Sequence, residues 1–251
     1  MKLVIIGGTG LIGSKVVKML REQGHEAVAA SPDTGVNTLT GDGLADALRG
    51  ASVVVDVSNS PSFEDAAVMK FFTTSTRSLL KYAAAAGVKH FVALSVVGTE
   101  RIPDSGYLRA KNVQESLIKG GGIPYSIVHA TQFFEFITRI ADEATQGTTV
   151  RLPSVLIQPM AGEDVAKAVA RTAVGTPLDG TVEVAGPQQF RFDELIREGL
   201  AARNDPRKVV VDPHARYFGA ELGERSLIPA GHARLGEIRF QEWLHQPVLH
   251  R

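Results

Sequence analysis

The chain has 251 residues, and 44% of them are hydrophobic, which is enough apolar material for one complete α/β core. Its 27 Lys and Arg residues balance its 27 Asp and Glu residues, so the zero net charge argues against nucleic acid and anionic membranes as partners. The absence of cysteine excludes disulfides, thiolate zinc sites and a cysteine nucleophile, and no apolar run approaches the roughly 18 residues of a membrane span. We therefore expect a single-domain cytoplasmic protein spanning residues 1–251.

Short β-branched runs alternate with amphipathic stretches along the chain, and this alternation predicts parallel strands joined by helices. In chain order, strands are predicted at residues 3–6, 27–30, shortly before 41, 53–57, 91–94, 125–128 and 181–184. Helices are predicted at residues 13–23, 43–49, 64–86, 106–119, 163–174 and 193–203. Because the strands are uniformly apolar, helices must cover both faces of the sheet. This pattern predicts a doubly wound parallel α/β fold, with residues 176–251 as a cap that shapes the substrate pocket.

A glycine-rich turn follows the first predicted strand directly and opens the first predicted helix. Glycine suits a tight turn that approaches a pyrophosphate without a Cβ, and a helix N-terminus offers N–H groups to the anion. The alternative is a turn that binds no ligand. The strand–turn–helix context favours a Rossmann-type dinucleotide site. Its predicted cofactor-binding residues are Gly7, Thr9, Gly10, Leu11, Ile12 and Gly13.

The end of the second predicted strand bears on the choice of cofactor. An acidic residue there would hold the ribose 2′-hydroxyl of NAD(H), but the strand ends at Ser31. Ser31 has no charge to repel a 2′-phosphate, and its hydroxyl can donate a hydrogen bond, so NADP(H) is expected in preference to NAD(H). Two observations leave NAD(H) open: no Arg lies between Arg21 and Arg49, and Asp33 could accept from the ribose. The alternative is that Ser31 is an ordinary polar turn residue with no role in cofactor binding.

Two further loops are expected to flank the cofactor at carboxyl ends of strands. The first contains Asp42 and would follow the strand expected shortly before residue 41. The second contains Ser58 and Asn59 and follows the strand at 53–57. Asp42 is alternatively the N-cap of the helix at 43–49, and the two roles can coexist.

The candidate catalytic residues are Ser95, Tyr107 and Lys111. The spacing of Tyr107 and Lys111 puts a phenol and an ammonium on one face of a helix. A phenol with a pKa near 10 is a poor base at neutral pH, but a nearby ammonium and an oxidised nicotinamide favour its anion. In reduction, Tyr107 would protonate the oxygen as hydride arrives, while the Ser95 hydroxyl holds the carbonyl in place. A tyrosine–lysine pair also occurs by chance on exposed helices, so its position twelve residues after Ser95 carries the interpretation.

The spacing of the glycines at 7, 10 and 13 resembles the short-chain dehydrogenase/reductase superfamily. Together with the segments 94–98, 107–111, 130–134 and 162–166, it makes nearly the whole chain resemble the NmrA-like, atypical members of that superfamily. The resemblance implies an NAD(P)-binding oxidoreductase. It also implies that the stretch after the strand at 125–128 lies against the nicotinamide, which makes Thr131, Gln132 and Phe133 candidates for nicotinamide contact or for the pocket wall.

Two functions follow from these residues. The first is an NADP(H)-dependent oxidoreductase that transfers hydride to or from a small carbonyl, quinone or related organic substrate, with Tyr107 as acid/base. The second is a non-catalytic NADP(H)-binding redox sensor that acts through a protein partner, because some NmrA-like proteins have lost the catalytic tyrosine. The intact Ser95, Tyr107 and Lys111 favour the enzyme. None of the seven histidines has a partner at metal-ligand spacing, so no metal is expected, and the oligomeric state is not encoded in any recognisable pattern.

Overall fold

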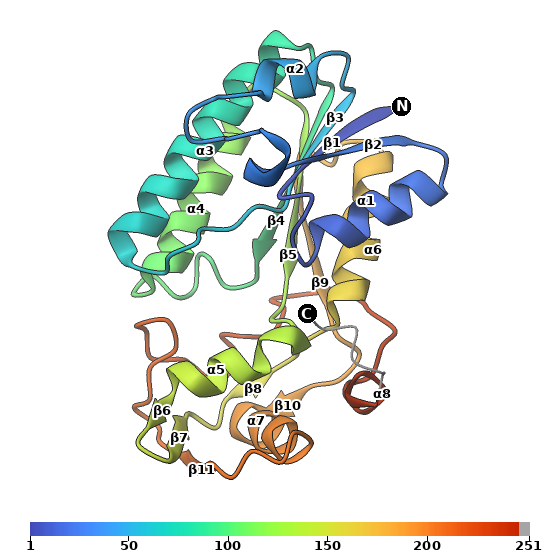
Figure 1. The fold of residues 1–251 in the computed structure, drawn as a ribbon. Coiled ribbons are helices and arrows are strands. Elements are labelled where there is room, and N and C mark those ends of the chain that lie inside the picture. Colours follow the sequence, from blue (N-terminus) through green and yellow to red (C-terminus); the bar gives the residue numbers. More distant parts are fainter. Residues whose placement is uncertain (246–251) are drawn as a thin grey trace.

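A computed structural model describes residues 1–245, and its centre is a seven-stranded parallel sheet. The strand order is β12-β9-β5-β4-β3-β1-β2 (Figure 1). The strands are β1 (Lys2–Ile6), β2 (Glu26–Ala30), β3 (Val53–Asp56), β4 (His90–Val96), β5 (Tyr125–Ala130), β9 (Gly180–Ala185) and β12 (Arg234–Leu235). The order runs outward in both directions from β1 and β3, which confirms the predicted doubly wound Rossmann-type fold.

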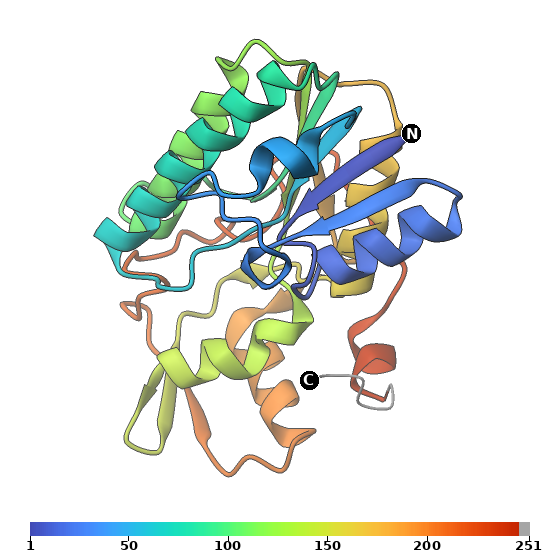
Figure 2. The same cartoon turned by 45° about the horizontal axis from the view of Figure 1, so that its top comes forward.

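Helices cover both faces of the sheet, as its uniformly apolar strands require. One face carries α1 (Gly13–Glu22) and α6 (Gly162–Val174), and the other carries α3 (Asp65–Ala85) and α4 (Gly106–Lys119) (Figures 1 and 2). Side chains alternate along β1, so Leu3 and Ile5 pack into the core under α1 and α6, whereas Val4 and Ile6 pack into the core on the opposite face. Within residues 1–245, no helix combines the length and the apolar content that crossing a bilayer requires.

A second layer lies beyond the carboxyl end of the sheet, in the lower half of Figure 1, and has its own core around Phe134, Phe192 and Phe240. It contains η2 (Phe134–Phe136), α5 (Ile137–Glu143), β6 (Thr145–Gln146), β7 (Thr149–Leu152), β8 (Leu156–Ile157), β10 (Phe190–Arg191), α7 (Phe192–Ala201), β11 (Lys208–Val211) and α8 (Phe240–Leu244). Two separate stretches therefore build this cap, one of which precedes the expected cap region 176–251. Residues 180–185 of that region belong instead to the main sheet as β9. Residues 246–251 of the expected domain lie outside the described part.

The strand expected shortly before residue 41 is the main error of the predicted fold. Residues 32–34 form the short helix η1 (Pro32–Thr34), and a loop leads from there to α2 (Leu44–Leu48). Asp42 therefore does not follow a strand. It does not cap α2 either, because Gly43 is the N-cap, with a φ of 71°, and no side chain bonds there. A Cβ on Gly43 would collide with the Gly35 carbonyl oxygen, so close backbone packing decides the conformation of this loop. The remaining predicted strands and helices are confirmed to within a few residues.

Candidate active site

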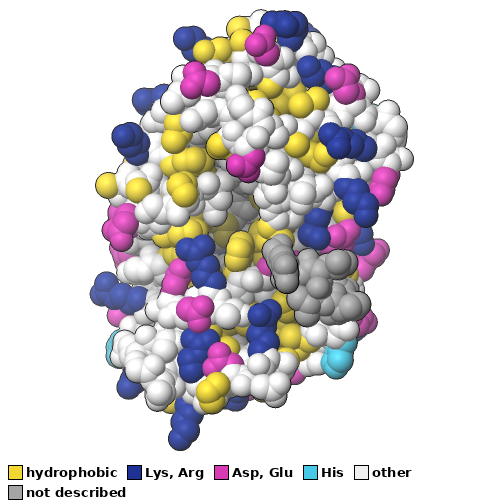
Figure 3. Space-filling view, in the orientation of Figure 1, with side chains coloured by type: hydrophobic (Ala, Val, Ile, Leu, Met, Phe, Trp, Pro, Cys, Tyr) yellow, Lys and Arg dark blue, Asp and Glu magenta, His cyan; other side chains and the backbone are white. Residues whose placement is uncertain are grey.

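A cavity of about 620 Å³ lies between the carboxyl end of the sheet and the cap. This volume falls within the roughly 300–1,000 Å³ of sites for small molecules and cofactors. Figure 3 shows hydrophobic side chains around the hollow between the two layers. The cavity brings together every predicted site residue except Asp42. These residues are Gly7, Thr9, Gly10, Leu11, Ile12, Gly13, Ser31, Ser58, Asn59, Ser95, Tyr107, Lys111, Thr131 and Phe133.

The glycine turn has the shape that a dinucleotide requires. Gly7 has a φ of 77°, and a Cβ there would lie 3.0 Å from the backbone of Ser58. A Cβ on Gly8 would lie 2.7 Å from the Cα of Ala29, and one on Gly13 would collide with the Gly7 carbonyl oxygen. The turn thus admits no side chain at these positions and leads directly into the N-terminus of α1, which favours an anion. These residues fit the pyrophosphate of a dinucleotide.

The end of β2 supplies hydroxyl groups to the cavity. The Thr9 hydroxyl donates to Ser31 Oγ over 3.1 Å. Asp33 lines the same end of the cavity. Within the described lining, the Lys and Arg residues are Lys111 of α4 and Arg139 of α5, and neither belongs to the segments that form this end. A 2′-phosphate here would therefore meet hydroxyl groups and no basic side chain of the described lining.

Ser95 lies inside β4, which continues to Val96, and its hydroxyl is engaged by a buried carboxylate. Ser95 Oγ donates to Glu115 Oε1 over 2.6 Å, and His129 Nε2 lies 2.8 Å from the same oxygen. Burial raises the pKa of Glu115, but the bonds from His129 and Ser95 and the charge of Lys111 outweigh it, so the net pKa lies below the ordinary value. Glu115 stays ionised and accepts the hydrogen bond of the Ser95 hydroxyl, so in this arrangement Ser95 offers the cavity only an acceptor oxygen. The expected donation from Ser95 to a substrate carbonyl requires its hydroxyl to turn.

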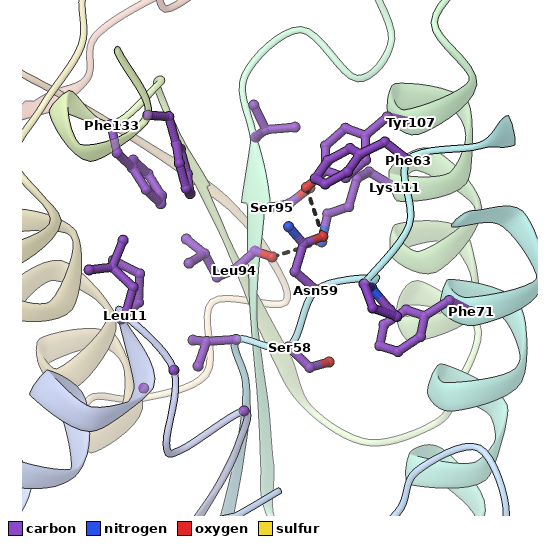
Figure 4. A pocket seen from close by; sticks show the side chains of 18 of the residues that line it. Leu11, Ser58, Asn59, Phe63, Phe71, Leu94, Ser95, Tyr107, Lys111 and Phe133 are labelled. Atoms are coloured by element: carbon purple, nitrogen blue, oxygen red, sulfur yellow. Dashed lines mark hydrogen bonds between the residues drawn. The ribbon is translucent and has the colours of Figure 1, made fainter. Parts of the chain in front are cut away.

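Tyr107 projects its hydroxyl into the cavity, where it donates to Asn59 Oδ1 over 3.3 Å (Figure 4). Burial raises the pKa of Tyr107 to about 12, although the bond to Asn59 and the charge of Arg139 act in the opposite direction. The phenol is therefore protonated at neutral pH. It is suited to donate a proton to a developing alkoxide, which is the reductive direction of the expected reaction.

Lys111 is buried and held by groups behind the cavity. Its Nζ donates to the Leu94 carbonyl oxygen over 2.9 Å (Figure 4). It also donates to Gln114 Oε1 and lies 4.5 Å from the ring centroid of Phe72. Gln114 Nε2 in turn donates to Asp56 Oδ2 over 3.0 Å. Burial lowers the pKa of Lys111 to about 8, and the charges of Asp56 and Glu115 oppose that shift.

The predicted set did not include Asp56 and Gln114, which complete this chain of hydrogen bonds. Burial also raises the pKa of Asp56, against hydrogen bonds from Ser58 and the charge of Lys111. The sequence contains a feature that could have identified each of these two residues. Asp56 ends a strand of three valines at the edge where ligands bind, and Gln114 lies three residues after Lys111 on the same helical face.

The stretch after β5 presents unpaired polar atoms at the cavity. Thr131 Oγ1 and Gln132 Oε1 are buried and have no hydrogen-bond partner among the described residues, and both residues line the cavity. Buried polar atoms are usually paired, so these two are available to a bound amide. Phe133 stacks on Phe136 with ring centroids 5.4 Å apart. This arrangement fits a nicotinamide ring with its carboxamide.

Aromatic side chains form a further part of the lining, and most of them were not predicted. Its rings come from the loop after β3, from α3, from η2 and from the segment between β11 and β12, which lie far apart in the sequence. A single aromatic residue in a loop does not by itself indicate a binding site, so the sequence offered little basis for predicting these rings. The unpredicted members are Phe63, Phe71, Phe136, Tyr217 and Phe218.

Comparison with known proteins agrees with this geometry. A family model described as NAD(P)H-binding matches residues 7–174. The photosystem II assembly factor Ycf39 of Cyanophora paradoxa is 25% identical over 226 residues, which cover 81% of this chain and 70% of that protein. The (4-alkanoyl-5-oxo-2,5-dihydrofuran-3-yl)methyl phosphate reductase of Streptomyces griseus subsp. griseus is 26% identical over 211 residues, covering 76% and 70% of the two chains.

Solved structures share the fold at low sequence identity. The UDP-glucose 4-epimerase of Thermus thermophilus in complex with NAD superposes with a TM-score of 0.72 at 16% identity, covering 97% of this chain and 96% of the epimerase chain. MoeE5 in complex with UDP-glucose and NAD has a TM-score of 0.69 at 18% identity, covering 87% of each chain. These likenesses confirm the Rossmann-type architecture.

Proposed function

Since this chain belongs to the NAD(P)H-binding family, we propose that it is an oxidoreductase that moves hydride between NADP(H) and a small carbonyl, quinone or related organic substrate. One observation carries the proposal: the glycine turn at residues 7–13, Tyr107 and Lys111 line a single cavity. We further propose that the sheet and the cap act as one domain, because both layers contribute walls to that cavity.

The proposed acid/base is Tyr107. When bound, the reduced nicotinamide supplies the hydride that forms a new C–H bond at the carbonyl carbon. As the π electrons move to the carbonyl oxygen, the Tyr107 hydroxyl gives that oxygen its proton, and water restores the phenol. Asn59 Oδ1 orients the hydroxyl before reaction, and the positive charge of Arg139 favours the phenolate that remains. A pKa of about 12 for Tyr107 keeps the phenol protonated at neutral pH, which is the form that the reductive direction requires.

The preference for NADP(H) rests on the end of β2. Ser31 places no carboxylate at the ribose, and its hydroxyl, which accepts from Thr9, can donate to a 2′-phosphate. Asp33 and the lack of a basic residue in this part of the described lining oppose that preference. We therefore expect NADP(H) to bind better than NAD(H) by only about tenfold, the effect of one hydrogen bond worth about 1.4 kcal/mol.

A redox sensor without catalysis is the second candidate. Two observations favour it: the Ser95 proton is engaged by Glu115, and relatives at 21–26% identity are named as photosystem II assembly factors. In this alternative the cofactor changes the surface that a protein partner binds, and Tyr107 only positions the cofactor.

Two measurements test the proposal. Calorimetry with NADPH and NADH measures cofactor binding, and NADPH oxidation with a panel of aldehydes, ketones and quinones measures turnover. Tyr107→Phe should keep cofactor affinity and lose turnover about 100-fold or more. Tyr125→Phe, at the opposite end of the sheet and outside the cavity lining, is the matched control. NADPH binding without turnover, unchanged in Tyr107→Phe, would overturn the enzyme and favour the sensor, whereas equal turnover in Tyr107→Phe would overturn Tyr107 as the acid/base.

A further inference from the structure

We propose that the substrate half of the cavity selects a flat, uncharged ring compound that carries a carbonyl group, and disfavours substrates with a phosphate. The inference relies on the proposed function for the position of the reacting group beside Tyr107. Recognition of the ring is argued separately, from the aromatic side chains and the charges of the cavity.

Three rings form one continuous aromatic surface around Tyr107, which we call the ring cluster: Phe63, Tyr107 and Phe218. Their centroids lie 5.4 Å apart for Phe63 and Tyr107, 5.5 Å for Phe63 and Phe218, and 5.7 Å for Tyr107 and Phe218. The angles between ring planes are only 27–33°, so the three rings are roughly parallel. Such a surface favours offset stacking of a further flat ring.

Aromatic rings also line the opposite side of the cavity. Figure 4 shows Phe133 facing the side from which Phe63 and Tyr107 project. Phe133 stacks on Phe136 with an interplanar angle of 23°. A nicotinamide and a planar substrate are both flat ring systems, and two facing aromatic walls suit a stack of the two.

Phe218 places its ring in the ring cluster although its own backbone conformation is unfavourable. Residues 217–220 form a tight turn closed by hydrogen bonds in both directions between Tyr217 and Ala220. Phe218 and Gly219 have φ values of 46° and 82°, a conformation that Asn and Gly adopt readily and Phe does not. The ring of Phe218 packs edge-on against Tyr217, with centroids 4.7 Å apart. An aromatic residue at the tip of this turn is therefore explained by its contact with the cavity, since the turn itself disfavours it.

The charges in the cavity disfavour a phosphate. Arg139 Nε is bound to Glu143 Oε1 over 3.0 Å, and its guanidinium lies 4.0 Å from the centroid of Phe63. Lys111 is turned toward Leu94 and Gln114, behind the cavity. The charge of Arg139 is thus balanced by the Glu143 carboxylate in the same described lining, and that carboxylate repels a phosphate, whose recognition depends on uncompensated cationic donors. The names of the Streptomyces relative and of the epimerase both include phosphorylated compounds, and we expect this chain to differ from them.

A matched pair of probes separates ring recognition from charge. 1-Naphthol and 1-naphthyl phosphate share one flat ring system, and neither can be reduced by NADPH, so calorimetry measures binding alone. We expect the NADP⁺-loaded protein to bind 1-naphthol at least tenfold more tightly than 1-naphthyl phosphate. Phe218→Leu should weaken 1-naphthol about tenfold, while Phe218→Tyr, which keeps a ring, should retain most of the affinity. Phe190→Leu, outside the cavity lining, is the control.

The outcomes distinguish this inference from the proposed function. Thermal unfolding of each variant confirms that it is folded, and Phe63→Leu provides a second test of the ring cluster. If 1-naphthol binds through the ring cluster but no carbonyl compound is reduced, this inference stands and the enzymatic proposal fails. If 1-naphthyl phosphate binds as tightly as 1-naphthol, or both leucine variants bind 1-naphthol like the wild type, the inference is overturned, whatever the turnover.

Discussion

Gln114 Nε2 donates to Asp56 Oδ2 over 3.0 Å, and this bond connects a buried carboxylate on β3 to the lysine beside Tyr107. The opposite side of Gln114 accepts from Lys111. The ammonium of Lys111 therefore has one carboxylate on its own helix, Glu115, and a second reached through an amide. The charges that act on it are thus those of Asp56 and Glu115, with His129 bound to Glu115.

Asp56→Asn should lower the pKa of Lys111 below its value of about 8, because the Asp56 carboxylate favours the charged ammonium. NMR titration of lysine labelled with ¹³C at Cε measures this pKa directly, and Lys111→Arg assigns the signal. Asp193→Asn removes another buried carboxylate, in α7, and serves as the control. An unchanged titration of Lys111 in Asp56→Asn would show that the bridge through Gln114 carries no electrostatic coupling.

Lys111 should also make stability depend on pH. Its folded pKa of about 8 is below the ordinary value of 10.5, so between these pH values the unfolded chain binds the extra proton and the free energy of unfolding rises with pH. The gain is at most about 3.5 kcal/mol, since one pKa unit corresponds to about 1.4 kcal/mol. Urea unfolding at pH 7.5 and pH 10 should show this gain in the wild type relative to Lys111→Met. Parallel pH profiles for the two proteins would contradict a depressed pKa.

Ser31→Asp should weaken NADPH about tenfold or more and leave NADH affinity equal or improved. A carboxylate at the end of β2 repels a 2′-phosphate and can accept from a ribose 2′-hydroxyl. Calorimetric titration with both cofactors measures the change, and Thr148→Asp, in the loop between β6 and β7, controls for added negative charge. Undiminished NADPH affinity in Ser31→Asp would place the 2′-phosphate elsewhere.

Gly13→Ala should abolish cofactor binding, because the new Cβ collides with the carbonyl group of Gly7 and forces the turn open. Gly120→Ala is a matched control, since a Cβ there meets its nearest atom at 3.5 Å. Fluorescence titration with NADPH compares the two variants, and circular dichroism verifies the fold. NADPH binding by Gly13→Ala at wild-type strength would mean that the turn does not hold the dinucleotide.

Ser95→Ala should reduce turnover less than tenfold, well below the loss expected for Tyr107→Phe. The Ser95 hydroxyl donates its hydrogen bond to Glu115, so it contributes little as a donor to the substrate. Steady-state kinetics with NADPH and a quinone measures both variants. Equal losses in the two variants would show that Ser95 turns toward the substrate and donates to it during the reaction.

The succession of neighbouring residues along the chain was enough to predict the features that depend only on sequence neighbours. A strand, a glycine turn and a helix in immediate succession define the dinucleotide loop, and a spacing of four residues places Tyr107 and Lys111 on one helical face. The uniformly apolar strands likewise require helices on both sides. Each of these features follows from backbone geometry within about a dozen residues, which is why the sequence could reveal it.

Which distant groups meet became known only from the folded chain. Folding directs the hydrogen bond of the Ser95 hydroxyl to Glu115, links Asp56 to Lys111 through Gln114, and assembles the ring cluster from three separate segments. It also removes Asp42 from the site, because residues 35–43 pack as a loop where a strand was expected. When a side chain has several possible hydrogen-bond partners, the one it binds depends on competition among all the groups that packing brings near it. The spacing of residues along the chain carries no information about that competition.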